Sequence, residues 1–552
     1  MEWPGEEIDE ALARLKARAP YWTSLDAAER IQHLRACLDG VARVAPDWVA
    51  RATAAKGGAD RGDLAGEEWL AGPVPVARNI RLLIEALEHE AEPPPIAMKT
   101  RRSGQLVATI VPGSLHDRLL FRGLHCDVWI EPGQPATQGR FYREPVGAGR
   151  LTVVLGAGNV SAIALMDVLH ELFVEGSVVL LKIHPLLATL GDPFLRAFDS
   201  LVKAGFLAIV QGGGDVGAAL VTHPLVDAIH ITGSAETHDR IVWGADPEER
   251  SARRRDGIPF NTRAITSELG CVTPVIVVPG EWTVDEVDFQ ARHIAAMLVH
   301  NASHNCTAAQ VLVTSREWDQ RDELLERLRA HLSDLPPRRT WYPGARSRYD
   351  RFVRQHQPTW HSTVHPEQEV PWTIVEGLTP ESDRFAFEQE LFCGGMVEVA
   401  LDAAGPDAFL DVAVRFANER LWGTLSAVVL IDEMTKDEHE RALDRAIEAL
   451  RYGAIGVNLW SGAIFGLASP PWGAFPGSTA ADIQSGCGFV HNTFLFDYPQ
   501  KSVTTAPFVM SPTPVWFPDH QNLLAVGKSL LDHEVQPTIA RLARVAWSAM
   551  RG

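Results

Sequence analysis

Residues 151–182 read LTVVLGAGNVSAIALMDVLHELFVEGSVVLLK. The stretch contains two short runs rich in Val and Leu, 151–155 and 178–182, separated by a helical pattern over 161–173. Continuous apolar runs of this kind are typical of parallel strands that are buried on both faces. Two parallel strands require a crossover connection, usually a helix. The stretch therefore predicts a βαβ unit and an α/β fold.

The same rhythm continues towards the C-terminus, and glycines or small polar residues follow the predicted strands. The further elements are helices over 193–204 and 216–222 and strands over 207–210 and 228–232. Gly156-Ala157-Gly158, Gly212 to Gly214 and Gly233-Ser234 follow strands, where helix N-termini can hold a pyrophosphate. The first of these motifs lacks the last glycine of GxGxxG, so a simple tight turn stays open beside a dinucleotide site.

Composition limits the classes of function. The chain has 552 residues and a net charge of -19, and its only dense basic run, at 250–255, is flanked by acids at 248, 249 and 256. We therefore expect no nucleic-acid partner. Six cysteines without a CxxC pair predict neither a zinc site nor disulfides, and we expect no metal and a reducing, cytoplasmic location. No apolar run is long enough to predict a membrane span.

Three polar residues supply the parts of a covalent active site. Cys306 ends the segment Asn301-Ala302-Ser303-His304-Asn305-Cys306, and Glu268 precedes it by 38 residues. Asn159 lies upstream, directly after Gly158. A thiol nucleophile, a carboxylate base and an amide donor are what acyl transfer or aldehyde oxidation needs. Each has an ordinary alternative: a core cysteine, an exposed strand-end carboxylate and a helix cap ahead of Ser161.

The order of these motifs resembles the aldehyde dehydrogenase superfamily from about residue 20 to about residue 505. Glu268-Leu269-Gly270 resembles the segment of the general base, and the Cys306 segment resembles that of the nucleophile. The resemblance implies that Asn159, with the Cys306 amide, stabilises an oxyanion. It also implies cofactor contacts, which would come from Lys182, Gly233, Ser234, Glu390 and Phe392.

The resemblance further implies an α/β architecture with a Rossmann-type cofactor domain, an α/β catalytic domain and a β oligomerisation arm. The expected boundaries are 1–105 and 143–268 for the NAD(P)-binding domain, 269–475 for the catalytic domain, 106–142 with 489–510 for the arm, and 511–552 for a C-terminal tail. The tail pattern predicts one or two amphipathic helices, which would gate a tunnel or pad a subunit contact.

The implied reaction is the NAD- or NADP-dependent oxidation of an aldehyde to a carboxylic acid, through a thiohemiacetal and a thioester on Cys306. The assembly would be a homodimer or homotetramer. Trp460, Phe465 and Trp472 fall where the family lines its substrate tunnel, which favours an aromatic or medium-to-long aliphatic aldehyde. The alternative is that these rings only pack a glycine-rich loop. Pro185 leaves NADP open, because no carboxylate there repels a 2′-phosphate.

The chain also departs from the family pattern. Cys271 replaces a glycine after the base, His304 replaces a glutamine before the nucleophile, and residues 244–261 form an insertion. His304 would either assist proton transfer or only hydrogen-bond nearby backbone. These departures keep two other functions open: a CoA-acylating dehydrogenase or acyl-CoA reductase, which Glu268 opposes, and a cofactor-binding scaffold without turnover.

Overall fold

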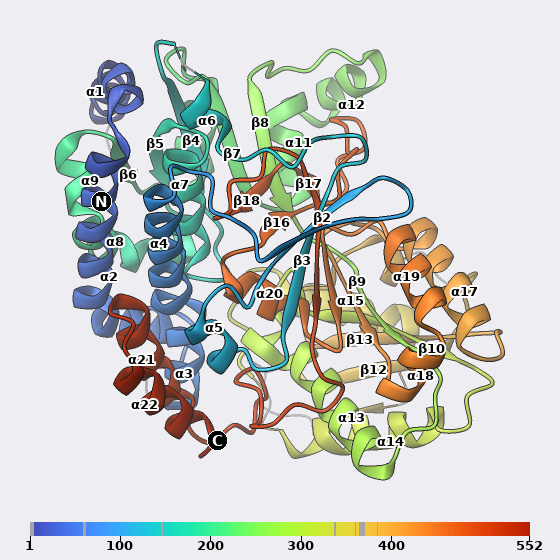
Figure 1. The fold of residues 1–552 in the computed structure, drawn as a ribbon. Helices are drawn as coiled ribbons and strands as arrows, with labels where there is room; N and C mark the ends of the chain where they lie inside the picture. Colours follow the sequence, from blue (N-terminus) through green and yellow to red (C-terminus); the bar gives the residue numbers. More distant parts are fainter. Residues whose placement is uncertain are drawn as a thin grey trace.

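Two β-sheets organise the computed structural model, which describes residues 5–58, 62–144, 147–335, 338–358, 360–363, 370–382 and 385–552 (Figure 1). One sheet has six strands in the order β17-β8-β7-β4-β5-β6. The other has eleven strands in the order β1-β2-β3-β19-β15-β14-β9-β10-β13-β12-β11. A third, two-stranded sheet pairs β16 (Pro471–Gly473) with β18 (Phe489–His491).

The six-stranded sheet confirms the predicted α/β fold. Its parallel strands are β4 (Arg150–Leu155), β5 (Ser177–Lys182), β6 (Leu207–Val210), β7 (Ala228–Gly233) and β8 (Ala264–Leu269). The helices α7 (Ile163–Phe173) and α10 (Gly214–Thr222) connect them as expected. The single helix predicted over 193–204 is instead two, α8 (Gly191–Ala197) and α9 (Asp199–Ala204), because the chain turns at the fully buried Phe198.

A layer of N-terminal helices covers this sheet. The layer consists of α1 (Gly5–Ser24), α2 (Ala27–Ala55), α3 (Gly62–Ala71) and α4 (Pro73–Glu88). Trp22 and Trp48 anchor it in the core with less than 1% exposure. Each indole N–H is satisfied, by the Leu172 carbonyl at 3.1 Å and the Ser161 hydroxyl at 2.9 Å. Burying large rings with paired N–H groups fixes the layer on the sheet.

The eleven-stranded sheet takes most of its strands from residues 269–475, the catalytic domain expected from the resemblance. Its strands from this region are β9 (Thr273–Val277), β10 (Ala309–Ser315), β11 (Trp360–His361), β12 (Thr373–Leu378), β13 (Gly395–Leu401), β14 (Ser426–Leu430) and β15 (Ala454–Val457). The helices of this part include α13 (Val284–Val299), α14 (Arg321–Asp334), α15 (Ala345–His356), α17 (Pro406–Arg420), α18 (Glu433–Glu438), α19 (Glu440–Ala449) and α20 (Ser461–Leu467).

The two arm segments lie side by side. Strands β2 (Leu106–Val111) and β3 (His125–Ile130) form a hairpin, and β19 (Pro499–Thr505) joins β3 antiparallel and β15 parallel. The arm therefore continues the catalytic sheet within one chain. Strand β1 (Ala97–Thr100), which the predicted boundaries assign to the cofactor domain, pairs with β2 and belongs to the arm.

The C-terminal tail packs against the N-terminal helices of its own chain. It forms α21 (Leu523–Val535) and α22 (Ile539–Ala549), and α21 contacts α3 and α4 (Figure 1). Glu534 on α21 is buried and accepts hydrogen bonds from Arg78 at 3.1 Å and Arg81 at 2.8 Å. The buried ion pairs join the two ends of the chain into one helical layer.

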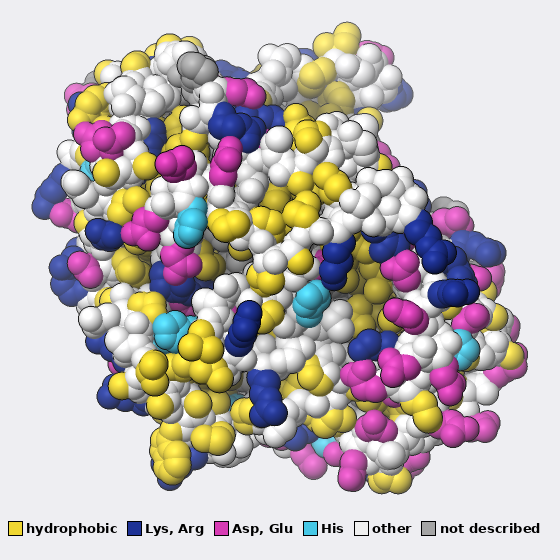
Figure 2. All heavy atoms as spheres, viewed as in Figure 1, with side chains coloured by type: hydrophobic (Ala, Val, Ile, Leu, Met, Phe, Trp, Pro, Cys, Tyr) yellow, Lys and Arg dark blue, Asp and Glu magenta, His cyan; other side chains and the backbone are white. Residues whose placement is uncertain are grey.

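The surface shown in Figure 2 carries both signs of charge. Acidic side chains gather at its lower right, where Figure 1 places α17, α18 and α19, and basic side chains are interspersed without a continuous stripe on this face. Among the described residues, no helix is both long and apolar enough to span a membrane.

Candidate active site

A cavity of about 1490 Å³ collects all eight residues predicted to touch the reacting atoms or the cofactor. They are Asn159, Lys182, Gly233, Ser234, Glu268, Cys306, Glu390 and Phe392. Asn159, Lys182 and Glu268 lie at or just beyond the carboxyl ends of β4, β5 and β8. Parallel strands present these ends along one edge of a sheet, which is where α/β proteins bind ligands.

The thiol of Cys306 and the carboxylate of Glu268 are in direct contact. Cys306 Sγ donates to Glu268 Oε1 at 3.5 Å, and the second oxygen, Oε2, is buried without a partner. Burial and then the charge of Asp167 raise the pKa of Glu268 to about 7. Burial and the charge of Glu268 raise the pKa of Cys306 well above its usual range. The resting pair therefore holds a neutral thiol beside a base that ionises near neutral pH.

The largest charge effects on the Cys306 thiol come from acidic groups, not from cations, in the part of the chain that the structure describes. The charged groups that shift its pKa are Glu268 and Glu390, both carboxylates. His304, two residues away, is buried and its pKa is lowered to about 3, so it carries no charge at neutral pH. Its Nδ1 lies 3.1 Å from the Phe392 carbonyl, which is the backbone interaction considered above. Proton removal by Glu268 is the remaining way to activate this thiol.

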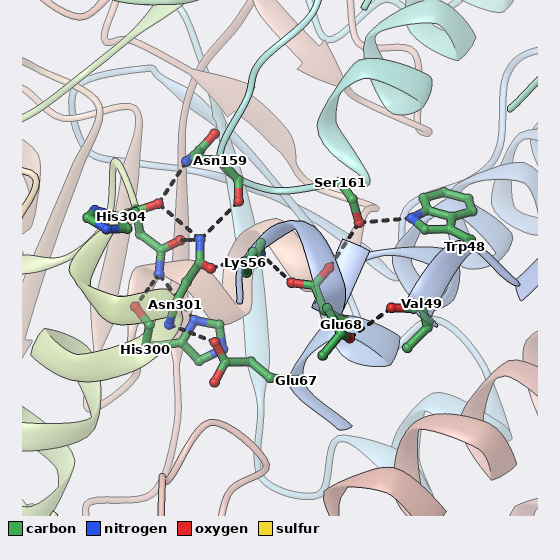
Figure 3. Close-up of polar contacts among 12 residues, drawn as sticks. Trp48, Val49, Lys56, Glu67, Glu68, Asn159, Ser161, His300, Asn301 and His304 are labelled. Atoms are coloured by element: carbon green, nitrogen blue, oxygen red, sulfur yellow. Dashed lines mark hydrogen bonds and ion pairs between the residues drawn. The ribbon is translucent and has the colours of Figure 1, made fainter. Parts of the chain in front are cut away.

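Asn159 holds the backbone beside the nucleophile. Its side-chain Nδ2 donates to the His304 carbonyl at 3.0 Å, and its own carbonyl accepts from Asn301 Nδ2 at 3.0 Å. The alternative of a helix cap is wrong, because the N-cap of α7 is Ala162. The amide of Asn159 thus lies on the cavity wall with its donor directed at the Cys306 loop (Figure 3).

The nucleophile loop has an unusual backbone. Asn301, Ala302 and Ser303 have φ values of 52°, 55° and 64°, the left-handed region that residues with a Cβ rarely occupy. Such a conformation costs of order 1 kcal/mol or more per residue and persists only where surrounding contacts impose it. Asn301 provides such contacts. Its side-chain Nδ2 donates to the carbonyls of Asn159 and His304, and its backbone N–H donates to Glu67 at 2.7 Å.

A buried charge network from the N-terminal layer reaches this loop (Figure 3). Lys56, at the end of α2, forms an ion pair with Glu68 and donates to Asn301 Oδ1 at 2.8 Å. Glu68 also accepts from Ser161 at 3.4 Å. The side chains of Lys56 and Glu68 are 8% and 3% exposed, so each charge depends on the other for compensation.

We expect Lys56→Met to lower the free energy of unfolding by about 3 kcal/mol, because Glu68 would become an unpaired buried charge. Urea unfolding of the purified protein measures this difference. The matched control is Lys56→Met combined with Glu68→Gln, which removes both charges and keeps the oxygen that Ser161 bonds. We expect the double variant to regain most of the loss; a double variant less stable than Lys56→Met would contradict the pairing.

Glu390 and Phe392 also line the cavity, and Glu390 lies beside Gly270 and Cys271, just after β8. Glu390 Oε1 accepts from the Cys271 N–H at 3.4 Å, and burial raises the pKa of this carboxyl to about 8. A Cβ on Gly270 would come within 2.3 Å of the Glu390 carboxylate, so glycine is needed for this approach. Phe392 packs edge-on against Tyr342 at 4.8 Å.

The three aromatic residues predicted to line a substrate tunnel do not line this cavity. Trp460 donates its indole N–H to the Thr307 carbonyl at 2.9 Å, which supports the residue after the nucleophile. Phe465 packs edge-on against Trp472 at 5.6 Å. Both tryptophans are buried, at 6% and 1% exposure. The rings therefore pack against other parts of the chain, and their role in lining a substrate tunnel stays a prediction.

The far part of the cavity suits a dinucleotide. Lys182 lines it and, among the described contacts, makes no hydrogen bond or ion pair, so its ammonium is available to a hydroxyl or phosphate. Helices α10 and α11 (Ala235–Trp243) begin at Gly214 and after Ser234, with their N-termini at the cavity wall. A Cβ on Gly214 would meet no atom within 4 Å, so glycine leaves space there for a ligand.

Sequence reasoning missed several cavity residues. The insertion forms α12 (Pro247–Asp256), and its Asp246 and Glu249 line the cavity, which places the insertion at the ligand site. Arg348 on α15 also lines it and donates to the Leu391 carbonyl at 2.9 Å. No motif marked these positions, because a long-range packing contact brings each of them to the site. Within the described chain, no three His, Cys, Asp or Glu side chains are arranged to hold a metal ion.

Fold and site together define an α/β protein with a dinucleotide-type cavity and a cysteine–glutamate pair. Residues 122–343 match the model of the Aldehyde dehydrogenase family. The motif order and the partial matches to curated relatives agree with this match, which covers about two fifths of the chain.

The relatives are distant. Betaine aldehyde dehydrogenase 2 of Rhizobium meliloti is 32% identical over 147 residues, 26% of either chain. N-succinylglutamate 5-semialdehyde dehydrogenase of Chromobacterium violaceum is 34% identical over 118 residues, 21% of either chain. The matched segments thus span about a quarter or less of these relatives.

Two solved structures have the same fold over most of the chain. Gamma-glutamyl-gamma-aminobutyraldehyde dehydrogenase from Burkholderia cenocepacia J2315 has a TM-score of 0.62 at 19% identity, covering 92% of this chain and 90% of that chain. An indole-3-acetaldehyde dehydrogenase in complex with NAD⁺ has a TM-score of 0.62 at 17% identity, with coverage of 92% and 90%. At these identities the likeness shows the fold alone.

Proposed function

We propose that the protein is an NAD(P)-dependent aldehyde dehydrogenase that oxidises an aldehyde to the carboxylic acid. The observation that carries the proposal is the 3.5 Å contact between Cys306 Sγ and Glu268 Oε1 on the wall of a cavity that also contains Asn159 and Lys182. A nucleophile beside its base and an oxyanion donor form the set that covalent aldehyde oxidation requires.

In the first step Glu268 removes the thiol proton while Sγ attacks the aldehyde carbon. The carbonyl π electrons move to oxygen, and a thiohemiacetal oxyanion forms on Cys306. The Asn159 amide and the Cys306 backbone N–H are the donors for that oxygen, and removal of one such donor typically costs 10²–10³-fold in kcat. To reach that oxygen, the Asn159 side chain must release the His304 carbonyl, or donate one amide N–H to each of the two acceptors.

In the second step the thiohemiacetal loses hydride and becomes a thioester. A nicotinamide cofactor, when bound, would supply the acceptor for this hydride. Glu390 would bond the nicotinamide ribose and Phe392 would form one wall for the ring, while Lys182 would bond the adenosine side. Glu268 then releases to solvent the proton that it took from the thiol. In the last step it takes a proton from water, the hydroxide attacks the thioester carbon, and the C–S bond breaks as Glu268 returns this proton to Cys306 and the acid leaves.

The cofactor is NAD or NADP. Lys182 and the helix N-termini at Gly214 and Ser234 fit either dinucleotide. One structural neighbour was solved with NAD⁺. Asp246 and Glu249 are the carboxylates at the cavity wall that would disfavour an added 2′-phosphate, provided the adenosine ribose lies next to them.

The substrate is an aldehyde, with the acid as product. The names of the relatives include polar aldehydes and an aromatic one. Since Trp460, Phe465 and Trp472 do not line the cavity, polar aldehydes belong in the test beside the apolar ones predicted from the sequence. A homodimer or homotetramer built on the arm, in a cytoplasmic location, completes the proposal.

The test is absorbance at 340 nm with purified protein, aliphatic, aromatic and polar aldehydes, NAD and NADP in parallel, and with or without coenzyme A. We expect reduction of the nicotinamide without coenzyme A, because Glu268 is in place to activate water. Turnover only with coenzyme A would favour the acylating dehydrogenase. Cofactor binding without turnover over the whole panel would favour the scaffold.

A further inference from the structure

One face of the cofactor sheet is polar beside the general base: His230, Thr232 and Glu268 are buried there, and Thr266 is exposed. Strands β7 and β8 are parallel, and their register pairs His230 with Thr266 and Thr232 with Glu268. Alternate residues of a strand share a face, so these four side chains lie on one face beside one another. Parallel sheets covered by helices are normally apolar on such a face. Four polar residues in a row therefore need a reason.

Asp167 of α7 completes this polar face. It is fully buried, accepts from the Thr232 hydroxyl at 2.9 Å and lies 3.6 Å from His230 Nε2. Its second oxygen, Oδ1, has no partner, and neither has Glu268 Oε2. A carboxylate at this depth is costly unless a counter-charge and hydrogen bonds support it. His230, 2% exposed, provides the counter-charge.

The two charges act on Glu268 in opposite directions. After burial, Asp167 is the main group that raises the pKa of Glu268, whereas His230 lowers it together with Trp472 and the Cys306 thiol. Burial alone would lower the pKa of His230, but Asp167, Glu171 and Glu268 raise it above its ordinary value, which favours the cationic ring. Asp167 also acts on His170 and His491, which flank it on the other side.

We propose that Asp167 and His230 are positioning residues that act through Glu268 and together fix the pH range in which Glu268 can deprotonate Cys306 and water. Asp167 favours retention of the proton on Glu268, and the His230 imidazolium favours its loss. The inference rests on the proposed function for the role of Glu268 as the base. It adds two residues on α7 and β7, neither of which lines the cavity.

The test measures the alkylation rate of Cys306 by iodoacetamide between pH 5.5 and 9, on the full chain without cofactor or aldehyde, by peptide mass spectrometry. The limb of this profile is the pH range over which the alkylation rate rises. Because Cys306 and Glu268 titrate as a coupled pair, the position of this limb reports the charge around both groups. We expect Asp167→Asn to move the limb down by about one pH unit, with about fivefold faster alkylation at pH 6. His230→Gln should move it up.

Asp432→Asn is the control, because it removes a buried carboxyl at the start of α18 that is not among the groups that shift the pKa of Glu268, His230 or Cys306. Its profile should coincide with that of the native chain. Coincident profiles for all variants, or shifts of the same sign for Asp167→Asn and His230→Gln, would overturn the inference. Should Asp167→Asn fail to fold, the upward shift in His230→Gln still decides. Opposite shifts in a protein that oxidises no aldehyde would remove the proposed function and leave the electrostatic roles intact.

Discussion

Replacement of Cys306 by alanine should lower aldehyde-dependent reduction of the nicotinamide by about 10⁴-fold or more, the usual cost of removing a covalent nucleophile. The thiol is the group in contact with Glu268, so the variant has no atom that can form the thiohemiacetal. Binding of NAD or NADP, followed by fluorescence, should stay close to that of the native protein. The cofactor contacts come from Lys182, Glu390 and other residues that the change does not touch.

Cys487→Ala is the control for thiol chemistry in general. Cys487 is half-buried on β17 (Gly486–Cys487), outside the cavity, where its Sγ donates to the Ile265 carbonyl at 3.2 Å. We expect native activity from this variant. Native activity in Cys306→Ala, or equal losses in both variants, would show that the reaction does not pass through Cys306.

The parts of the fold that sequence predicts well are those set by local pattern. The strands over 151–155 and 178–182 extend by one residue each in the structure, as Arg150–Leu155 and Ser177–Lys182. Their continuous apolar runs can only be satisfied in a covered parallel sheet. The same pattern predicts that Asn159, Lys182 and Glu268 reach one cavity, because each of these residues lies at or just beyond the carboxyl end of a parallel strand.

The parts that sequence does not predict depend on contacts between distant segments. Lys56 lies 245 positions from Asn301, and nothing in the helical pattern of α2 marks it as the support of the nucleophile loop. Trp460 and Trp472 have the composition of a tunnel wall, yet packing turns them into the core. Asp167 lies among apolar residues of α7, and only the register of β7 with β8 shows that it lies behind the base.

Replacement of Glu268 by glutamine should separate the two halves of the reaction. Glu268 is the one carboxylate in contact with Cys306 among the described residues, and it serves as the base for both the thiol and the water. Glutamine has nearly the same shape but cannot accept a proton at neutral pH. Hydride transfer would continue slowly from the thiolate fraction that exists without a base, whereas hydrolysis of the thioester would nearly stop. We therefore expect a burst of about one reduced nicotinamide per active site, followed by turnover reduced by about 10²–10⁴-fold.

The pH dependence provides a second readout of the same carboxylate. Burial and Asp167 raise the pKa of Glu268 to about 7, so the native enzyme should gain activity as the pH rises through about 7, where the base ionises. Glu268→Gln should lack this limb, and its residual rate should instead follow the higher-lying ionisation of the Cys306 thiol. Stopped-flow absorbance at 340 nm across pH 6 to 9 measures both the burst and the limb. Steady turnover of Glu268→Gln without a burst, with the native pH profile, would mean that another group activates the water and that the 3.5 Å contact with Cys306 is only structural.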